Sequence, residues 1–553
     1  MSKLLTPLEL WGEFDPNDTP LNTDVFKTVD DGEVKKEYVF FSGRLAKDGV
    51  TRVFGVIARP SKEGIYPSLF ICKNISKPLD EEELSFWAKR GFVAMSIDYF
   101  GEIANMRHTL YPTSRDYCNY SRAGRRATFV DDTVRETVWY EYVINSMRAM
   151  SVLESKNQGK IRIIAIKEAN KVGIILSAMD KRIEATSVIF GDIWEEEKSE
   201  SEQMNLNTGA DELNAQLAMS EELDRRIVGL APQSYLQYIN SPIYIIININ
   251  SHHSITSQNV EAIGRINNAR RLMIFSNCVA NVNSRNIETM SNWLKNPTDM
   301  STDSVSIKLS ESNGQIIATA TVTGEKDLFT TIWYNRGSKV NKQWLLAHSV
   351  TDSNGTTTAI LDLYSSTAQI EVFATVHGKI SYSSEIVSII PEKITSGKLV
   401  LKNKTRLLFS GESEENIFMP MMDKTDSDWH KEIPIPVIEK GLFNIKGIKG
   451  KNFGTFAIRD DKVDRLGTDT LCFDISSKVT QPLVVEAVEN WNGEEKRYFS
   501  KVMVTDNGKW NKVVLSKSRF KTADGEELRD NDDIDLLAFY SEQDIMLNNL
   551  ILT

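Results

Sequence analysis

The chain contains six histidines, and two of them, His252 and His253, are adjacent and follow Ser251. A serine, a histidine and a carboxylate can form a nucleophilic site in which the histidine removes the serine proton. Residues that are direct neighbours in sequence rarely reach the geometry that a nucleophile and its base require. A metal site would combine the two histidines with Asp98 or Glu102, but no HExxH or comparable spacing supports it. We therefore expect no metal and no cofactor.

Two charged residues, Lys167 and Glu168, follow the apolar run IRIIAI at residues 161–166. A buried carboxylate or amine can have a pKa that suits catalysis. A charge at the edge of a sheet is more often simply solvated. We treat Glu168 as a residue that lines a cleft and assign no reaction to it.

Cysteine usage and charge exclude several classes of protein. The four cysteines form no CxxC pair, so we expect neither a zinc site nor a disulfide framework. The formal net charge is −11 and no basic block is present, which argues against a nucleic-acid partner. The sequence shows no signal peptide and no apolar run of about 20 residues. We therefore expect a cytoplasmic protein without a membrane partner.

The first part of the chain, up to residue 298, alternates between short β-branched runs and helical patterns. The runs SLFIC, FVAMSIDY, IRIIAI and PIYIIINI are apolar almost throughout, which is typical of strands buried on both faces. The best helical pattern spans residues 131–155, and we expect Asp131 or Asp132 to cap it. This alternation predicts a doubly wound, mostly parallel sheet covered by helices.

The pattern changes after the sequence WLKNP. Residues 299–392 alternate apolar and polar side chains between turn signals, which predicts an antiparallel β-sandwich. Residues 393–553 consist again of short strands, which predicts a jelly roll. The α/β domain then spans residues 35–298, with a polar helical insertion at residues 200–226 near the sheet edge where α/β folds keep their sites. Residues 1–34 form an N-terminal extension.

Residues 35–298 resemble an α/β-hydrolase of the acetyl xylan esterase or dipeptidyl-peptidase-like kind. The order of the landmarks carries the resemblance: ARPSKEGIYPSLFIC, EEELSFWAKRGFVAMSIDYFGE, VDDTVRETVWYEYVINSMRAMSVLES, SAMDKRIEATSVIFG and SPIYIIININSHH. The middle sandwich resembles the immunoglobulin-like modules appended to such hydrolases. The C-terminal strands resemble a carbohydrate-binding jelly roll. The resemblance implies an elbow serine, an oxyanion loop and a triad acid and histidine.

The nucleophile and the oxyanion loop of that family are missing at the matching positions. The elbow G-x-S-x-G presents its serine above the sheet, and the matching residues here place Ala169 at its centre. The methyl group of Ala169 cannot attack a carbonyl. The oxyanion loop is glycine-rich so that its N–H groups can turn toward developing charge. Here it reads Lys73-Asn74.

The acid and the base of the triad are missing as well. The acid should fall at Asn250 or Ser251, and neither is a carboxylate. The histidine should fall near Ala280 or Asn281, in a segment without histidine. The degenerate catalytic positions are therefore Ala169, Asn250, Ser251 and Asn281. The candidate cleft residues are Lys73, Asn74, Glu168, Ala169, His252 and His253.

Aromatic residues near the C-terminus are candidates for glycan binding, since sugar faces stack on aromatic rings. Trp491 and Tyr498 flank the polar turn NGEEKR, and for both residues packing in the core is the equal alternative. Trp510 and Phe520 lie at strand starts, where aromatic side chains usually pack, so we expect both in the core.

These observations predict a multidomain protein with an α/β-hydrolase fold followed by two all-β domains. The expected function is that of a catalytically inactive, hydrolase-like binding or scaffold protein with a glycan or a protein as partner. Two alternatives stay open. One is an active carbohydrate esterase of the serine type that uses residues near His252 and His253. The other is a structural subunit of an assembly.

Overall fold

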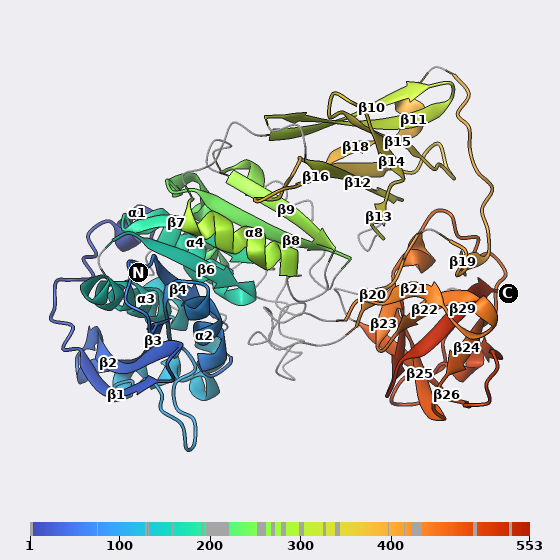
Figure 1. Ribbon diagram of the computed structural model, residues 1–553. Helices are drawn as coiled ribbons and strands as arrows, with labels where there is room; N and C mark the ends of the chain where they lie inside the picture. Colours follow the sequence, from blue (N-terminus) through green and yellow to red (C-terminus); the bar gives the residue numbers. More distant parts are fainter. Residues whose placement is uncertain are drawn as a thin grey trace.

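We describe the protein from a computed structural model of the 553-residue chain. The structure describes residues 4–73, 76–127, 130, 132–157, 159–189, 193–194, 221–250, 262–266, 271–277, 284–297, 304–324, 328–337, 343–395, 397–413, 415–421, 434–489, 495–529 and 534–553. Three regions follow one another along the chain (Figure 1). They are the α/β region, residues 4–297, the first β region, residues 304–389, and the second β region, residues 407–553.

The α/β region is built on one sheet with the strand order β1-β2-β3-β5-β4-β6-β7-β8-β9. β1, β2, β3 and β5 pair antiparallel, whereas all pairs from β5 through β4 to β9 are parallel. This confirms a mixed, mostly parallel sheet. Its strands are β1 (Asp24–Asp30), β2 (Val34–Ala46), β3 (Gly49–Pro60), β4 (Ser68–Cys72), β5 (Val93–Ile97), β6 (Ile161–Ile166), β7 (Ile183–Ile189), β8 (Ile243–Ile249) and β9 (Arg271–Asn277).

Helices cover both faces of this sheet. Alternate residues of β6 show it, because Ile163 packs in the cluster of α3 and α4 while Ile164 packs in the cluster of α2 and α8. A strand buried on both faces needs few polar residues, and Arg162 is the one charged residue in β6. The helices are α1 (Pro7–Trp11), α2 (Glu81–Lys89), α3 (Val138–Lys156), α4 (Asn170–Met179), α6 (Glu221–Leu230) and α8 (Ser284–Lys295).

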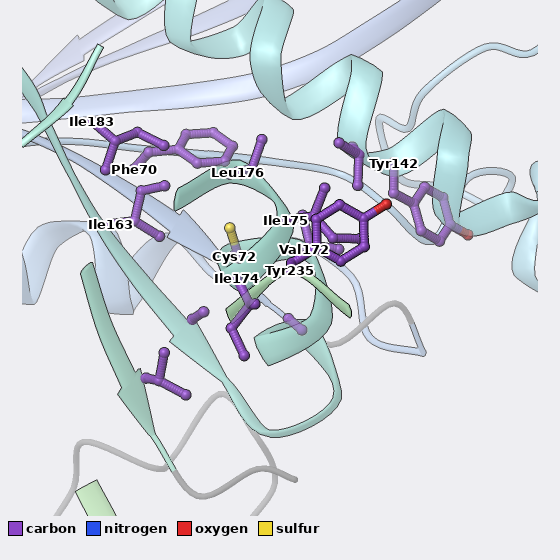
Figure 2. Packing of buried hydrophobic residues seen from close by; sticks show 14 of the residues in the cluster. Phe70, Cys72, Tyr142, Ile163, Val172, Ile174, Ile175, Leu176, Ile183 and Tyr235 are labelled. Atoms are coloured by element: carbon purple, nitrogen blue, oxygen red, sulfur yellow. The ribbon is translucent and has the colours of Figure 1, made fainter. Parts of the chain in front are cut away.

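The helix that follows β6 lies very close to the sheet. A Cβ atom on Gly173 of α4 would come within 2.3 Å of the Cβ of Ala165, so only glycine allows this approach. Side chains from β4, α3 and the segment before β8 close around the helix (Figure 2). The residues in this packing include Phe70, Cys72, Tyr142, Ile163, Val172, Ile174, Ile175, Leu176, Ile183 and Tyr235.

The long helix α3 begins later than the sequence predicted. Its cap is Thr137, whose hydroxyl accepts a hydrogen bond from the Tyr140 N–H (3.2 Å). A short 3-10 turn, Val134–Glu136, precedes it with its own threonine cap, so Asp132 does not start the helix. Trp139, Met147 and Met150 are buried, which confirms that they pack in the core.

The N-terminal residues, expected to form an extension, belong to the α/β region. β1 pairs with β2 at the edge of the sheet. The Trp11 ring stacks on Tyr140 at 4.8 Å, and its N–H donates to the Tyr235 hydroxyl (3.0 Å). The buried Arg148 of α3 donates to main-chain carbonyls of the N-terminal segment, including Pro16 (2.8 Å). The segment therefore covers the outer side of α3.

The first β region consists of two antiparallel sheets, β10-β11-β15-β14 and β13-β12-β16-β17, with β18 paired to β16. Its strands are β10 (Ser304–Ser312), β11 (Gln315–Thr323), β12 (Phe329–Arg336), β13 (Leu345–Leu346), β14 (Ser349–Thr351), β15 (Thr357–Leu361), β16 (Ile370–His377), β17 (Tyr382–Ser383) and β18 (Val387–Ile389).

The second β region is also antiparallel, with the sheets β21-β22-β29-β24-β27 and β20-β23-β28-β25-β26, and with β19 paired to β29. Its strands are β19 (Leu407–Phe409), β20 (Met419–Pro420), β21 (Val437–Lys440), β22 (Lys446–Gly450), β23 (Phe453–Thr455), β24 (Thr470–Ser477), β25 (Gln481–Glu489), β26 (Lys496–Val504), β27 (Asn511–Ser516), β28 (Ile534–Ser541) and β29 (Ile545–Leu552). In the α/β region, most of the predicted helical insertion at residues 200–226 lies outside the described residues. Its last residues belong to α6.

Candidate functional site

The turn after β6 has the backbone strain of a nucleophile elbow. β6 ends at Ile166, and Lys167 then takes a left-handed φ of +51°, which non-glycine residues rarely adopt. A 3-10 turn, Lys167–Ala169, leads directly into α4. In an α/β-hydrolase, the strained residue of such a strand-to-helix turn is the nucleophile.

Lys167, and not Ala169, is the residue of this turn with a left-handed φ. Ala169 has an ordinary φ of −72° and no exposed surface. Ala165 and Ala169 stand two residues before and after Lys167, where G-x-S-x-G has its glycines. The expectation that Ala169 stands at the serine position stays a prediction.

Glu168 lies at the turn between β6 and α4. Its side chain is exposed, and that of Lys167 is half-buried. The expectation that Glu168 lines a cleft stays a prediction.

Lys73, a predicted cleft residue, is folded into the protein. It follows β4, it is only 6% exposed, and its Nζ lies 2.5 Å from Glu83 and 3.3 Å from Asp80. Burial opposes its charge, but Glu83 and Asp80 outweigh burial and raise the pKa of Lys73. Lys73 therefore fastens the segment after β4 to the start of α2 and does not line an open cleft.

The thiol of Cys72, at the end of β4, is fully buried. Burial raises the pKa of this thiol, so it stays protonated. Because the thiolate is the reactive form of cysteine, Cys72 is a packing residue and not a nucleophile.

Asn250, which the sequence predicted as one of two matches to the triad acid, makes a structural contact with the first β region. It follows β8 with a left-handed φ of +56° and is 2% exposed. Its Nδ2 donates to the Trp344 carbonyl (3.0 Å), and its Oδ1 accepts the Trp344 N–H (2.7 Å). A carboxylate can only accept hydrogen bonds, so this reciprocal pair requires an amide.

Trp344 belongs to a short segment of the first β region, residues 343–347, that contacts both neighbouring regions. We call it the joint segment. The Trp344 ring packs on Phe373 at 4.9 Å, and Phe373 packs on Phe275 of β9 at 4.5 Å. The preceding Gln343 accepts the Phe456 N–H of the second β region (3.1 Å). No local sequence pattern predicts this role of Trp344.

Six predicted residues cannot be placed. Asn74, Ser251, His252, His253, Asn281 and Trp491 lie outside the described residues. Among the residues that the structure does describe, no three His, Cys, Asp or Glu side chains are grouped so that they could hold a metal ion. Likewise, no helix in the described ranges is long and apolar enough to cross a membrane.

The described aromatic residues of the second β region agree in part with their predictions, since Tyr498 follows its packing alternative and only Trp510 differs. Tyr498 is 1% exposed, and its hydroxyl donates to Glu489 (3.2 Å), so its ring faces the core and cannot stack on a sugar. Phe520 is buried, as predicted. Trp510, predicted in the core, is half-buried at the surface, where its Nε1 donates to the Leu442 carbonyl (3.2 Å).

The α/β region is similar in structure to α/β-hydrolase esterases. The acetyl xylan esterase from Paenibacillus sp. R4 is 13% identical, and the match covers 50% of this chain and 90% of that protein with a TM-score of 0.37. Acetyl xylan esterase 1 from Thermoanaerobacterium sp. JW/SL YS485 is 10% identical, with coverages of 49% and 84% and a TM-score of 0.33. A cold-adapted esterase from an Arctic intertidal metagenomic library is 12% identical, with coverages of 47% and 89% and a TM-score of 0.31.

These low identities and TM-scores limit the similarity to shape over about half of the chain. No protein-family model matches the sequence. No curated protein matches it either.

Proposed function

We propose that the chain is a catalytically inactive, hydrolase-like binding or scaffold protein. Asn250 carries this proposal. Both hydrogen-bonding groups of its side chain are used by the Trp344 backbone. The place where a triad acid would orient a histidine thus holds the first β region on the α/β region.

The elbow residue supports the same proposal. An ester hydrolase forms an acyl-enzyme on a hydroxyl or thiol and then releases it with water. The Lys167 amine at the apex would form an amide with the acyl group instead. An amide is far more stable to hydrolysis than an ester, so such a site would stop after one acyl transfer.

The glycan-binding part of the proposal rests on the second β region. We assign it as a carbohydrate-binding jelly roll over residues 393–553, and the first β region as an immunoglobulin-like sandwich over residues 299–392. Because Tyr498 is buried, Trp491 is the remaining candidate of the pair that flanks the turn NGEEKR. Its indole would stack on a sugar face.

The test is steady-state hydrolysis of acetyl and longer acyl esters by the purified full chain, beside an active esterase. We expect no saturable turnover from the wild type. Turnover that disappears in His252→Ala or His253→Ala would contradict the proposal and support an active esterase.

A binding assay separates the remaining alternatives. We expect retention of the wild type on an insoluble polysaccharide and loss of retention in Trp491→Ala, with Trp510→Ala as the aromatic control. An inert chain that binds no polysaccharide and forms one defined oligomer would instead support a structural subunit of an assembly.

A further inference from the structure

The hairpin between β21 and β22 exposes several apolar side chains at its turn. Leu442 is 37% exposed, Phe443 74% and Ile445 40%. We call these three residues, together with Trp510, the apolar tip. Monomeric soluble proteins rarely present neighbouring large apolar side chains to water without a use for them.

The backbone of the turn holds Phe443 outward at a conformational cost. Phe443 has a φ of +59° and Asn444 a φ of +60°, and a bulky residue in this region is an outlier. Hydrogen bonds from the Gly441 N–H to the Ile445 carbonyl (2.9 Å) and from the Ile445 N–H to the Leu442 carbonyl (3.2 Å) hold the turn. Because Phe443 remains mostly exposed, packing within the chain does not repay this strain.

Trp510 lies against the same turn from a neighbouring loop. Its indole N–H donates to the Leu442 carbonyl (3.2 Å). A Cβ atom on Gly447 would come within 3.0 Å of the far edge of the indole, so glycine leaves room for the ring. The indole is therefore fixed beside Leu442 with part of its surface in solvent.

Lysines surround the apolar tip. Lys440 and Lys446 are direct partners across the β21–β22 ladder, and like charges in this position destabilise a hairpin. Lys446 lies 3.3 Å from Glu412, whereas Lys440 is exposed and has no ion pair within the described residues. Lys509, directly before Trp510, is also exposed. The surface thus combines apolar side chains with excess positive charge, in a chain whose net charge is −11.

We propose that the apolar tip docks on a bilayer surface that contains anionic lipids. Phe443, Leu442 and Trp510 would enter the boundary between headgroups and acyl chains, where aromatic and aliphatic side chains are stable. The lysines would face the anionic headgroups. A glycan platform fits less well, because the turn presents aliphatic Leu442 and Ile445 beside Phe443 and not a row of ring faces. The proposal differs from the sequence-based expectation of no membrane partner, and it is independent of the proposed function.

The experiment is co-sedimentation of the full chain with vesicles of phosphatidylcholine alone, or of equal amounts of phosphatidylcholine and phosphatidylserine. We expect binding to the mixed vesicles only, and weaker binding at high salt. Phe443→Ser should weaken binding at least about tenfold, since it removes one inserted ring. Lys440→Ala should weaken it about fivefold.

The matched control is Phe329→Ser, which removes another exposed phenylalanine (65%) from the first β region. It should bind as the wild type does. Since Phe443 is exposed, an unchanged urea midpoint will show that the Phe443→Ser variant is folded. Equal binding by Phe443→Ser and the wild type would overturn the proposal. If the chain does not bind vesicles but is retained on an acidic polysaccharide, and Phe443→Ser abolishes this retention, the membrane proposal is overturned in favour of a glycan.

Discussion

Asn250 shows at the scale of one residue how a side-chain amide can join two regions of the chain. A side chain amide has a donor and an acceptor, and the Trp344 main chain uses both. Exchange of the amide for a carboxylate would keep the shape and remove the donor. The chemistry of the triad and the contact with Trp344 therefore exclude each other at this residue.

We expect Asn250→Asp to destabilise the protein by about 3 kcal/mol, because it leaves the buried Trp344 carbonyl without a donor and places a charge beside it. The urea midpoint measures this change. The control is Asn313→Asp, since Asn313 has a similar φ of +52° and is exposed. Equal midpoints for the two variants would show that the Asn250 contact contributes nothing.

Tyr38 makes the free energy of unfolding of the α/β region change with pH in the alkaline range. Burial and its hydrogen bond to Glu81 (2.6 Å) raise the pKa of Tyr38 from 10.0 to about 12. The folded state thus holds this proton more tightly than the unfolded state. The contribution of Tyr38 to the free energy of unfolding is complete below pH 10 and is lost as the pH rises through 12.

Tyr38→Phe should therefore lower the urea midpoint at pH 8 and should differ less from the wild type near pH 12. Urea unfolding at both pH values measures the two differences. Tyr66→Phe is the control, since the Tyr66 hydroxyl donates to the Lys62 carbonyl and not to a carboxylate. A difference between wild type and Tyr38→Phe that grows with pH would contradict this account.

At the scale of the element, α4 depends on close contact with β6. Gly173→Ala should force the helix away from Ala165 and cost about 1–3 kcal/mol, although alanine is the better helix former. Thermal unfolding measures the change. Gly264→Ala, where no atom lies within 4 Å of the added Cβ, is the matched control and should be neutral or stabilising. A neutral Gly173→Ala would mean that the helix can move without cost.

The elements were easier to predict than the site, for physical reasons. Runs such as IRIIAI and PIYIIINI identify strands because burial on both faces removes the polar residues. The left-handed φ of Lys167 could not be predicted, because it is a property of the backbone and not of a residue type. The contact of Asn250 with Trp344 joins residues 94 positions apart, and no local pattern encodes it. Tyr498 of β26 pairs with the neighbouring β25, whose other partner, β28, lies later in the chain, so the sheet around Tyr498 also needs a non-local pairing.

At the scale of the whole molecule, the joint segment connects three regions. Trp344 bonds to the α/β region and Gln343 to the second β region. A buried ion pair strengthens the second connection, since Arg336 of β12 donates to Asp460 (2.8 Å) and both side chains are 4% exposed. Burial opposes the charge of Arg336, but Asp460 outweighs burial and raises the pKa of the guanidinium.

Arg336→Met should destabilise the two β regions by about 3–5 kcal/mol, because it leaves Asp460 buried without its partner. Arg336→Met combined with Asp460→Leu should recover part of this loss. Urea unfolding followed by tryptophan fluorescence measures both. Lys402→Met removes the exposed pair with Asp362 and should cost less than about 1 kcal/mol. If Arg336→Met costs no more than Lys402→Met, the buried pair does not hold the two β regions together.

Hydrogen exchange of the joint segment tests most directly whether the edge of the sheet at Asn250, after β8, is a structural contact. The measurement is the exchange rate of a peptide that covers residues 343–347, in the wild type and in Asn250→Ala. The account predicts that the wild-type Trp344 N–H, bonded to Asn250 at 2.7 Å, exchanges as slowly as the strand β12. Asn250→Ala should accelerate its exchange at least about tenfold. Fast exchange in the wild type, unchanged by Asn250→Ala, would show an open edge and contradict the account.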